Sequence, residues 1–278
     1  MRARAEHRRR RVPGGAAFLC VALLAALPVA SALTPVGAAG GRAALGPDGE
    51  IGVPPFGVGE RLKFEIKYGF ISAGTATLGI PETVTERGYE CYRIVSLAES
   101  NSFFSAFFTV RDVAESYLDT RELVPRRFEK RLREGNFRAH DIVLFDHDRH
   151  VALYPKRGDR LVPISVGAQD ILSSLYYVRM MDLTVGRSTF IDNHADRKNY
   201  PLEIKVLRKE RVKVPVGRFD CLVVEPVMRG AGLFSHQGRL TVWLTDDAAR
   251  IPVLMKSKIM VGSITAVLTD VDYADVHQ

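Results

Sequence analysis

The chain is dominated by a period-two alternation of apolar and polar residues, which is typical of β-strands with one buried and one exposed face. Residues 61–68 (Arg-Leu-Lys-Phe-Glu-Ile-Lys-Tyr) show it clearly, and similar segments recur as far as residue 271. Turn-forming sequences such as residues 146–149 (Asp-His-Asp-Arg) separate them. Strands joined by short connections favour antiparallel pairing. The alternation therefore predicts a mainly β protein, built as an antiparallel curved sheet, half-barrel or barrel.

Two segments depart from this alternation. Between residues 169 and 183, apolar residues such as Ile171, Leu172 and Leu175 fall at helical spacing, and Asp170 suits a helix start. We therefore expect one α-helix, at about residues 169–183, to cover the sheet. Residues 103–108 (Phe-Phe-Ser-Ala-Phe-Phe) fit either a strand continuation or a short helical turn.

The first 32 residues have the order of features of an export signal. A run of four arginines at residues 8–11 precedes an apolar segment at 16–27 and the small residues Ala-Ser-Ala at 30–32. We predict a signal peptide over residues 1–32, cleavage after Ala32 and a periplasmic location. The alternative is an uncleaved membrane anchor. Residues 33–56, rich in Gly, Pro and Ala, predict a flexible linker, and residues 57–274 a single β-rich domain.

The net charge argues against a nucleic-acid-binding body. The whole chain carries +7, but six arginines and one acid precede residue 33, and the remaining 33 basic and 31 acidic residues leave +2. A local basic cluster survives, in which Arg127, Arg131 and Arg133 are candidate contacts for an anion or a partner. The alternative is a solvated strand face with interspersed acids such as Glu129.

Two cysteines, Cys91 and Cys221, lie beyond the signal segment. An exported chain can pair them in a disulfide. They can equally be two separate buried thiols, packed as small apolar side chains. A redox or nucleophilic role is a third alternative, although there is no Cys-x-x-Cys motif.

Familiar catalytic motifs are absent from the sequence. There is no Gly-x-Ser-x-Gly, no His-Glu-x-x-His and no glycine-rich phosphate loop. The His/Asp clusters at residues 140–150 and 192–196 could supply metal ligands, and Asp246 with Asp247 could act as an acid/base pair. Hairpin turns have the same composition, because turn tips are solvated. We therefore expect no catalytic residue, no metal and no cofactor.

Large apolar residues suggest a binding cavity as one alternative. Ile171, Leu175, Tyr176, Met180 and Trp243 are bulky and adaptable enough to line a cavity for an acyl chain. The other alternative is that they fill the core.

Several motifs together resemble a known family. Residues 59–64 (Gly-Glu-Arg-Leu-Lys-Phe), 73–76 (Ala-Gly-Thr-Ala), 170–179 and 242–247 (Val-Trp-Leu-Thr-Asp-Asp) resemble the bacterial "domain of unknown function 3108" proteins. This resemblance covers residues 57–274 and implies an exported, mostly β protein without an established activity. Residues 219–272 also resemble the end of outer-membrane lipoprotein carrier proteins, which implies an open half-barrel around an acyl-binding cavity.

The sequence as a whole predicts an exported, non-enzymatic envelope protein. We expect it to bind an apolar or amphipathic ligand, for which a lipid is the candidate, or an envelope protein. Membrane contact would come from an uncleaved signal or from peripheral binding. The alternatives are an envelope hydrolase or metalloenzyme, and a structural or assembly factor.

Overall fold

The computed structural model describes residues 53–228, 239–258 and 262–274, so the predicted signal peptide and most of the predicted linker lie outside the described residues. The first eight strands are β1 (Arg61–Tyr68), β2 (Ile71–Glu86), β3 (Tyr89–Ser100), β4 (Arg111–Asp119), β5 (Pro125–Glu134), β6 (Phe137–Asp146), β7 (Val151–Tyr154) and β8 (Arg160–Pro163). The next six are β9 (Ser188–Ala195), β10 (Lys198–Val214), β11 (Gly217–Met228), β12 (Leu240–Thr245), β13 (Pro252–Lys258) and β14 (Ser263–Asp272).

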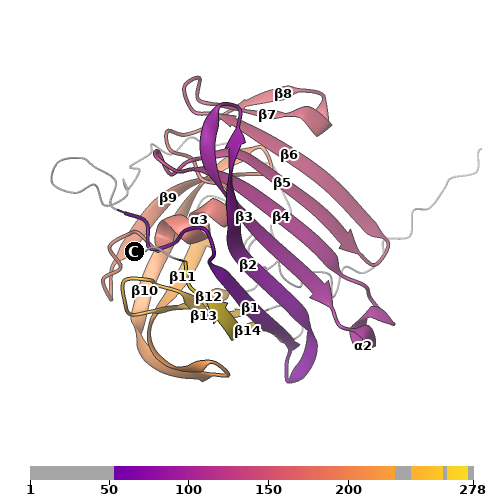
Figure 1. The fold of residues 1–278 in the computed structure, drawn as a ribbon, viewed down its shortest axis with the longest axis vertical. Coiled ribbons are helices and arrows are strands. Elements are labelled where there is room, and N and C mark those ends of the chain that lie inside the picture. The colour runs from indigo at the N-terminus through magenta and orange to yellow at the C-terminus, as the bar shows by residue number, and fades with distance from the viewer. Residues whose placement is uncertain (1–52, 229–238, 259–261, 275–278) are drawn as a thin grey trace, which may run out of the picture.

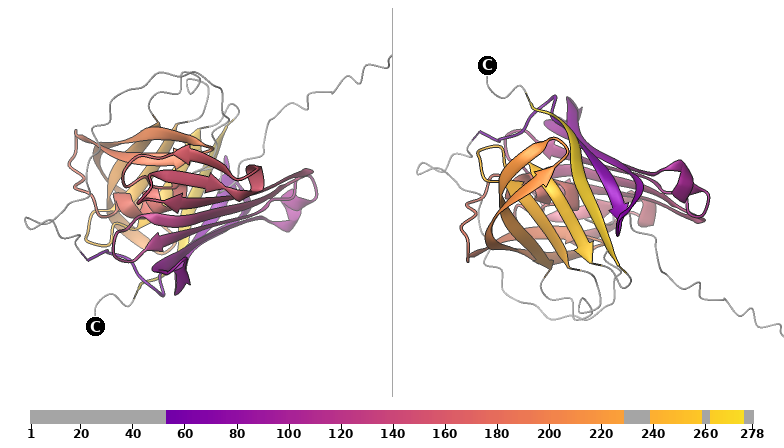
Figure 2. Two further views of the ribbon diagram at one scale, coloured as in Figure 1. Left: turned by 90° about the horizontal axis from the view of Figure 1, so that it is seen from above. Right: turned by 90° about the horizontal axis from the view of Figure 1, so that it is seen from below.

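These strands form one antiparallel sheet in the order β8-β7-β6-β5-β4-β3-β2-β1-β14-β13-β12-β11-β10-β9 (Figure 1). Each strand pairs with its neighbour in sequence, except that β1 pairs with β14 and joins the two halves. The two edges are β8 and β9, which do not pair with each other, so the sheet stays open. The sheet curves so that its two halves face each other (Figure 2). The prediction of an antiparallel curved sheet is confirmed, and it is not a closed barrel.

The predicted covering helix is α3 (Ile171–Val178), which lies in the connection from β8 to β9, between the two halves of the sheet (Figure 1). The Asp170 carboxylate accepts hydrogen bonds from the backbone N–H groups of Leu172 and Ser173, at 2.8 and 2.9 Å. The Ser173 hydroxyl accepts in return from the Asp170 N–H, at 2.9 Å, which completes a capping box.

The helix is shorter than the predicted range of residues 169–183. Residues 179–181 continue as turns, in which each N–H bonds to the carbonyl three residues before it. Two further short helices are α2 (Ser102–Ser105), which resolves the 103–108 alternative as a helical turn, and the 3-10 helix η1 (Pro155–Arg157). Among the described residues, no helix is long and apolar enough to cross a membrane.

The core lies inside the curve of the sheet, and Phe56 and Tyr176 are two of its largest fully buried side chains. Their rings pack edge to face with centroids 4.9 Å apart. Phe56, the last residue of the predicted linker, is therefore part of the packed core. Burying a phenylalanine stabilises a fold by about 2–3 kcal/mol, which draws the chain onto the sheet before β1 begins.

Cys91 and Cys221 are both buried, free cysteines. Cys91 lies on β3 and Cys221 on β11, with five strands between them in the sheet. A disulfide requires Cα atoms within about 7 Å of each other. The disulfide candidate is therefore corrected to two separate buried thiols. Burial is the main cause that raises the pKa of each thiol to about 12.

Candidate functional site

The two faces of the β3–β6 region are distinguished by their contacts with α3. The Ser116 hydroxyl on β4 donates to the Asp170 carboxylate at the start of α3, at 2.5 Å, so Ser116 lies on the inner face. Side chains alternate between the faces of a strand. Glu115 on β4 and its cross-strand partner Glu129 on β5 therefore point to the outer face.

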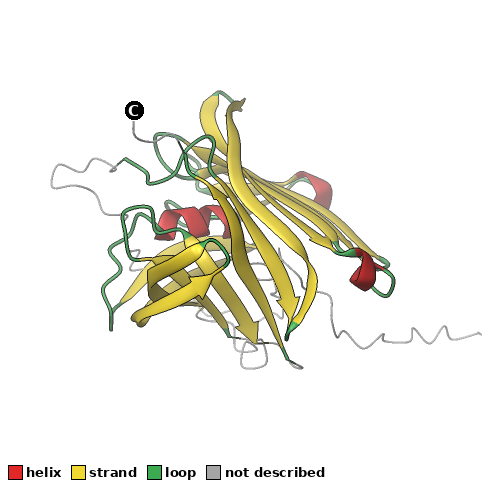
Figure 3. Cartoon of the chain, turned by 60° about the horizontal axis from the view of Figure 1, so that its bottom comes forward, coloured by secondary structure: helices red, strands yellow, loops and turns green. Residues whose placement is uncertain are grey.

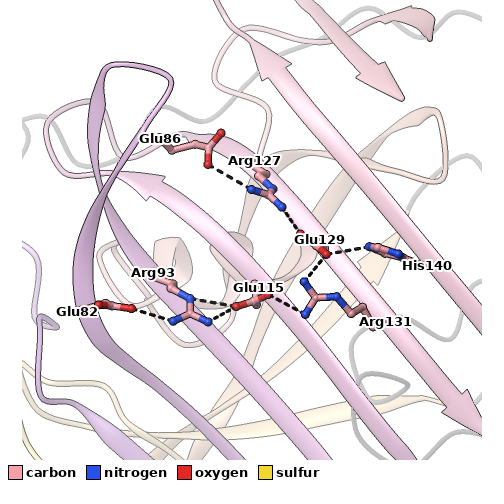
Figure 4. A network of polar contacts seen from close by, with 8 residues as sticks. All are labelled: Glu82, Glu86, Arg93, Glu115, Arg127, Glu129, Arg131 and His140. Atoms are coloured by element: carbon pink, nitrogen blue, oxygen red, sulfur yellow. Dashed lines mark hydrogen bonds and ion pairs between the residues drawn. The ribbon is translucent and has the colours of Figure 1, made fainter. Parts of the chain in front are cut away.

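A network of charged side chains covers this outer face (Figure 4). Its centre is formed by Glu115 and Glu129, whose side chains are only 5% and 2% exposed. Arg131 contacts both carboxylates, at 3.4 Å to Glu115 and 2.5 Å to Glu129. Arg93 binds Glu115 at 2.5 Å and Glu82 at 2.8 Å.

Glu129 accepts from a second set of donors, because Arg127 and His140 also contact it. The His140 Nε2 atom lies 2.8 Å from its carboxylate, and Arg127 also reaches Glu86 at 3.4 Å. Burial alone would raise the pKa of Glu129, but the hydrogen bonds from His140 and Arg127 and the nearby Arg131 lower it overall. The network thus holds Arg127 and Arg131 in place by charge pairing.

Beside this network the outer face is hollowed, in a space of about 560 Å³ that we call the arginine hollow. Its lining comes from β4, β5 and β6: Arg111, Val113, Arg131, Leu132, Arg133, Arg138, Ala139 and His140. Four arginines and a histidine thus line it, and no acidic side chain does.

The four arginines differ in how their charge is compensated. Arg111 pairs with Glu99 at 2.9 Å, and Arg131 belongs to the network. Within the described residues, Arg138 donates only to the backbone carbonyls of Gly135 and Phe137, at 2.6 and 2.7 Å.

Arg133 is exposed, as are the other three arginines of the hollow, and its side chain has no ion-pair partner among the described residues. Two guanidinium groups of the hollow therefore lack a carboxylate within the described part of the chain. A guanidinium presents forked N–H donors that match a carboxylate or a phosphate.

The structure brings together two of the three predicted basic contacts. Arg131 and Arg133 both line the arginine hollow, whereas Arg127 lies elsewhere on the same face. The guanidinium of Arg127 is held by Glu86 and Glu129 and stacks over the Tyr117 ring at 5.1 Å. Arg127 therefore supports the face rather than lining the hollow.

The predicted apolar site residues all belong to the packed core. Tyr176, Leu175 and Trp243 are buried, and Ile171 and Met180 are partly buried against the same core cluster. The fully buried Tyr176 ring packs on Phe56. This packing corresponds to the core alternative for these residues, and their role as cavity lining stays a prediction.

The predicted His/Asp clusters have structural contacts of their own. His147 is buried with its Nε2 atom 2.9 Å from the Pro125 carbonyl, and burial lowers its pKa. His194 lies between the Tyr154 hydroxyl and the Asn199 side chain, at 2.8 and 2.7 Å. Among the described residues, no group of three or more His, Cys, Asp or Glu is arranged to hold a metal ion.

The Asp246–Asp247 pair belongs to a turn. The Asp247 carboxylate accepts from the backbone N–H groups of Ala249 and Arg250, both at 3.0 Å. Asp246 pairs with Lys209 at 2.6 Å. These contacts are those of a capped hairpin turn.

The sequence interpretation missed a pair of buried carboxyl groups, Asp112 on β4 and Glu134 on β5. Asp112 also accepts a hydrogen bond from the Arg133 N–H at 2.9 Å. Burial is the first cause that raises both pKa values, and the neighbouring Asp112 charge helps to bring that of Glu134 to about 7. A signal existed, because Asp112 occupies an inward position in the strand alternation, between Val110 and Ala114.

The fold and the site define an open antiparallel β protein with a basic hollow on its outer face. The chain belongs to the family described as "Protein of unknown function (DUF3108)", whose family model matches residues 63–269. The resemblance to this family is therefore confirmed. None of the curated proteins matches the chain.

One solved structure supports the fold, and two more distant ones are reported with it. A "Beta-barrel-like Protein of Domain of Unknown Function DUF1849" from Brucella abortus is similar with a TM-score of 0.50 at 10% identity, over 79% of this chain and 99% of that chain. A "putative lipoprotein" from Parabacteroides distasonis covers 79% and 99% of the two chains, at 12% identity and a TM-score of 0.37. A "putative exported protein with YmcC-like fold" from Bacteroides fragilis covers 79% and 98%, at 9% identity and a TM-score of 0.29.

Proposed function

We propose that this chain is an exported, non-enzymatic binding protein of the bacterial envelope, and that the arginine hollow holds the anionic group of an amphipathic ligand. The observation that carries the proposal is the lining of the hollow, which has four arginines and a histidine and no acid. The signal-like order of residues 1–32 supports the location.

The charge pairing within the outer face supports binding of an anion rather than a cation. The Arg131 guanidinium is already held by Glu115 and Glu129, so little side-chain entropy is lost when it meets a ligand. Arg133 and Arg138 have no carboxylate partner within the described residues and are available to an incoming anion. A phosphate or carboxylate can accept forked hydrogen bonds from such groups.

The hollow also has an apolar part, which favours an amphipathic ligand over a free inorganic anion. Val113 lies on the outer face and lines it together with the cations, whereas the Leu132 side chain packs against the core. Each methylene group buried against such a surface adds about 0.8 kcal/mol of binding free energy. A ligand with a charged head and a short alkyl chain would satisfy both parts of the hollow.

Calorimetric titration with decyl phosphate, below its micelle concentration, tests this function. We expect saturable binding to the wild-type protein and weaker or undetectable binding of decanol and of inorganic phosphate. The double variant Arg133→Ala/Arg138→Ala should bind decyl phosphate at least about tenfold more weakly, since it loses two charge-assisted contacts. The probe should be recovered chemically unchanged, as checked by mass spectrometry.

The matched control is Arg160→Ala/Arg218→Ala, which removes the same charge from two exposed positions outside the hollow. It should bind decyl phosphate as the wild type does. Equal affinities of the two double variants would overturn the proposal, and so would the absence of binding to the wild type.

A further inference from the structure

Three hairpin connections lie at the same end of the sheet, and α2 is part of the middle one (Figure 1 and Figure 3). The Asn101 N–H and side-chain amide, between β3 and α2, donate to the carbonyls of Ala73 and Ser72 on β2, at 2.9 and 2.7 Å. The Gly135 N–H, between β5 and β6, donates to the Thr109 carbonyl at 2.7 Å. The β1–β2, β3–β4 and β5–β6 connections are therefore tied together.

These connections expose large apolar side chains, and we call this part of the molecule the aromatic end. Its members are Phe70 and Ile71 from β1–β2, Phe103 and Phe107 from β3–β4, and Phe137 from β5–β6. Their exposed fractions run from 54% to 102%, and the four phenylalanines are all those that the described residues expose. Single exposed apolar residues are ordinary, but a group of this size marks an interaction site.

The aromatic end is held by ordered contacts. The Asn101 side chain caps α2 by accepting from the Phe104 N–H at 2.9 Å, and the Ser100 and Ser105 hydroxyl groups are 2.7 Å apart. Phe104 and Phe108 pack against the core.

Phe103 and Phe107 stay exposed on the same short segment, with ring centroids 5.8 Å apart. The segment thus uses one pair of phenylalanines for folding and leaves the other pair outside. The exposed rings are not explained by core packing.

Cationic side chains lie directly behind these rings. Arg138 follows Phe137 in the chain, and Arg133 lies opposite Arg138 in the β5–β6 pairing. Neither has a carboxylate partner in the described part of the chain. Arg111, at the start of β4, is paired with Glu99. The nearby Asp112 and Glu134 carboxyl groups are buried, and they do not neutralise the surface by direct pairing with Arg133 or Arg138.

We propose that the aromatic end docks on a membrane surface that contains anionic phospholipids. Projecting rings on separate hairpins can enter a fluid interface without a matching pocket, whereas a protein partner would need complementary shape at each ring. Arginines set behind the rings would lie at the depth of the phosphate groups, where basic residues strengthen binding to anionic lipids. This inference goes beyond the binding of a single ligand in the hollow.

Vesicle flotation tests the docking, with protein that is purified from the cells that export it and is not truncated further. We expect binding to vesicles of phosphatidylethanolamine and phosphatidylglycerol at 3:1, and much weaker binding to phosphatidylcholine. The variant Phe103→Ser/Phe107→Ser/Phe137→Ser should bind at least about tenfold more weakly, since three rings no longer enter the interface. The matched control is Leu161→Ser/Val166→Ser/Tyr273→Ser, which changes exposed apolar residues outside the aromatic end and should bind normally.

A second measurement is independent of any membrane contact made by the N-terminal segment. The single substitution Phe107→Trp should introduce tryptophan fluorescence that brominated anionic lipids quench. Leu161→Trp, on the distant edge strand β8, should show no more quenching than the native Trp243 does. Equal vesicle binding of the serine variant and its control, or equal quenching at both tryptophans, would overturn the docking. A wild-type protein that binds vesicles but not decyl phosphate would overturn only the function proposed for the hollow. The serine variant keeps the arginines of the hollow, so the two experiments test different residues.

Discussion

Arg179, at the end of α3, donates two hydrogen bonds to the carboxylate of Glu60, which directly precedes β1, at 2.8 and 2.7 Å. Their side chains are 1% and 2% exposed, so this is a buried ion pair. Arg179 also donates to the carbonyls of Pro55 and Ala249. One guanidinium therefore joins the helix, the segment before the first strand and the β12–β13 turn.

Removing one partner of this pair should strongly destabilise the protein. We expect Arg179→Met to lower the free energy of unfolding by about 3–5 kcal/mol, because Glu60 is left buried without its cation. Urea unfolding measures the change. The double variant Glu60→Gln/Arg179→Met should recover part of the loss, and a single variant as stable as the wild type would contradict the role of the pair.

The Asp112–Glu134 pair should make stability fall as pH rises. The pKa of Glu134 is raised to about 7 in the folded protein, so between about pH 4.5 and pH 7 the folded state holds a proton that the unfolded state releases. Stability from this group is thus complete at low pH and is lost as pH rises through 7. Glu134→Gln should be more stable than the wild type at pH 8 by roughly 2 kcal/mol.

The pH test for this pair is a series of urea unfolding curves from pH 4.5 to pH 8. The difference between Glu134→Gln and the wild type should grow with pH over this range. A difference that stays constant, or shrinks with rising pH, would show that the two carboxyl groups do not share a proton. The control is Glu210→Gln, which changes a solvent-accessible carboxyl group on β10.

The outer network should have the opposite pH dependence. Because the pKa of Glu129 is lowered by its basic neighbours, its stabilisation is present above the ordinary pKa of a glutamate and is lost as pH falls through the lowered value. We expect Glu129→Gln to cost about 1–3 kcal/mol at pH 7. Unfolding at pH 3 should show a much smaller difference from the wild type. An undiminished difference at pH 3 would refute the charge contribution.

The two buried thiols should be unreactive in the native protein. Burial raises the pKa of Cys91 and Cys221 to about 12, so little thiolate exists at pH 8. Iodoacetamide should leave both unmodified under native conditions and alkylate both in urea without prior reduction. Peptide mass mapping distinguishes them from Cys20. Alkylation in urea that required a reductant would restore the disulfide alternative.

The strand pattern and the start of α3 could be predicted from the sequence, because both follow from local spacing. Period-two alternation specifies a half-buried strand wherever it occurs, and Asp170 caps the helix through residues within three positions of itself. The helix end could not be predicted in the same way. The apolar spacing continues to Met181, but the segment beyond Val178 turns so that Arg179 reaches Glu60, 119 residues away in the chain.

Long-range contacts in the folded chain decide which buried polar residues meet and which apolar residues stay exposed. Asp112 and Glu134 meet because β4 and β5 pair, and Arg131 becomes part of a network because Glu115 lies on the neighbouring strand. Phe56 is buried in the core although the residues before it have the composition of a linker. Phe103 and Phe107 stay exposed although their segment is rich in phenylalanine. Burial depends on what the fold brings to each side chain from distant parts of the chain, and local composition carries no record of that.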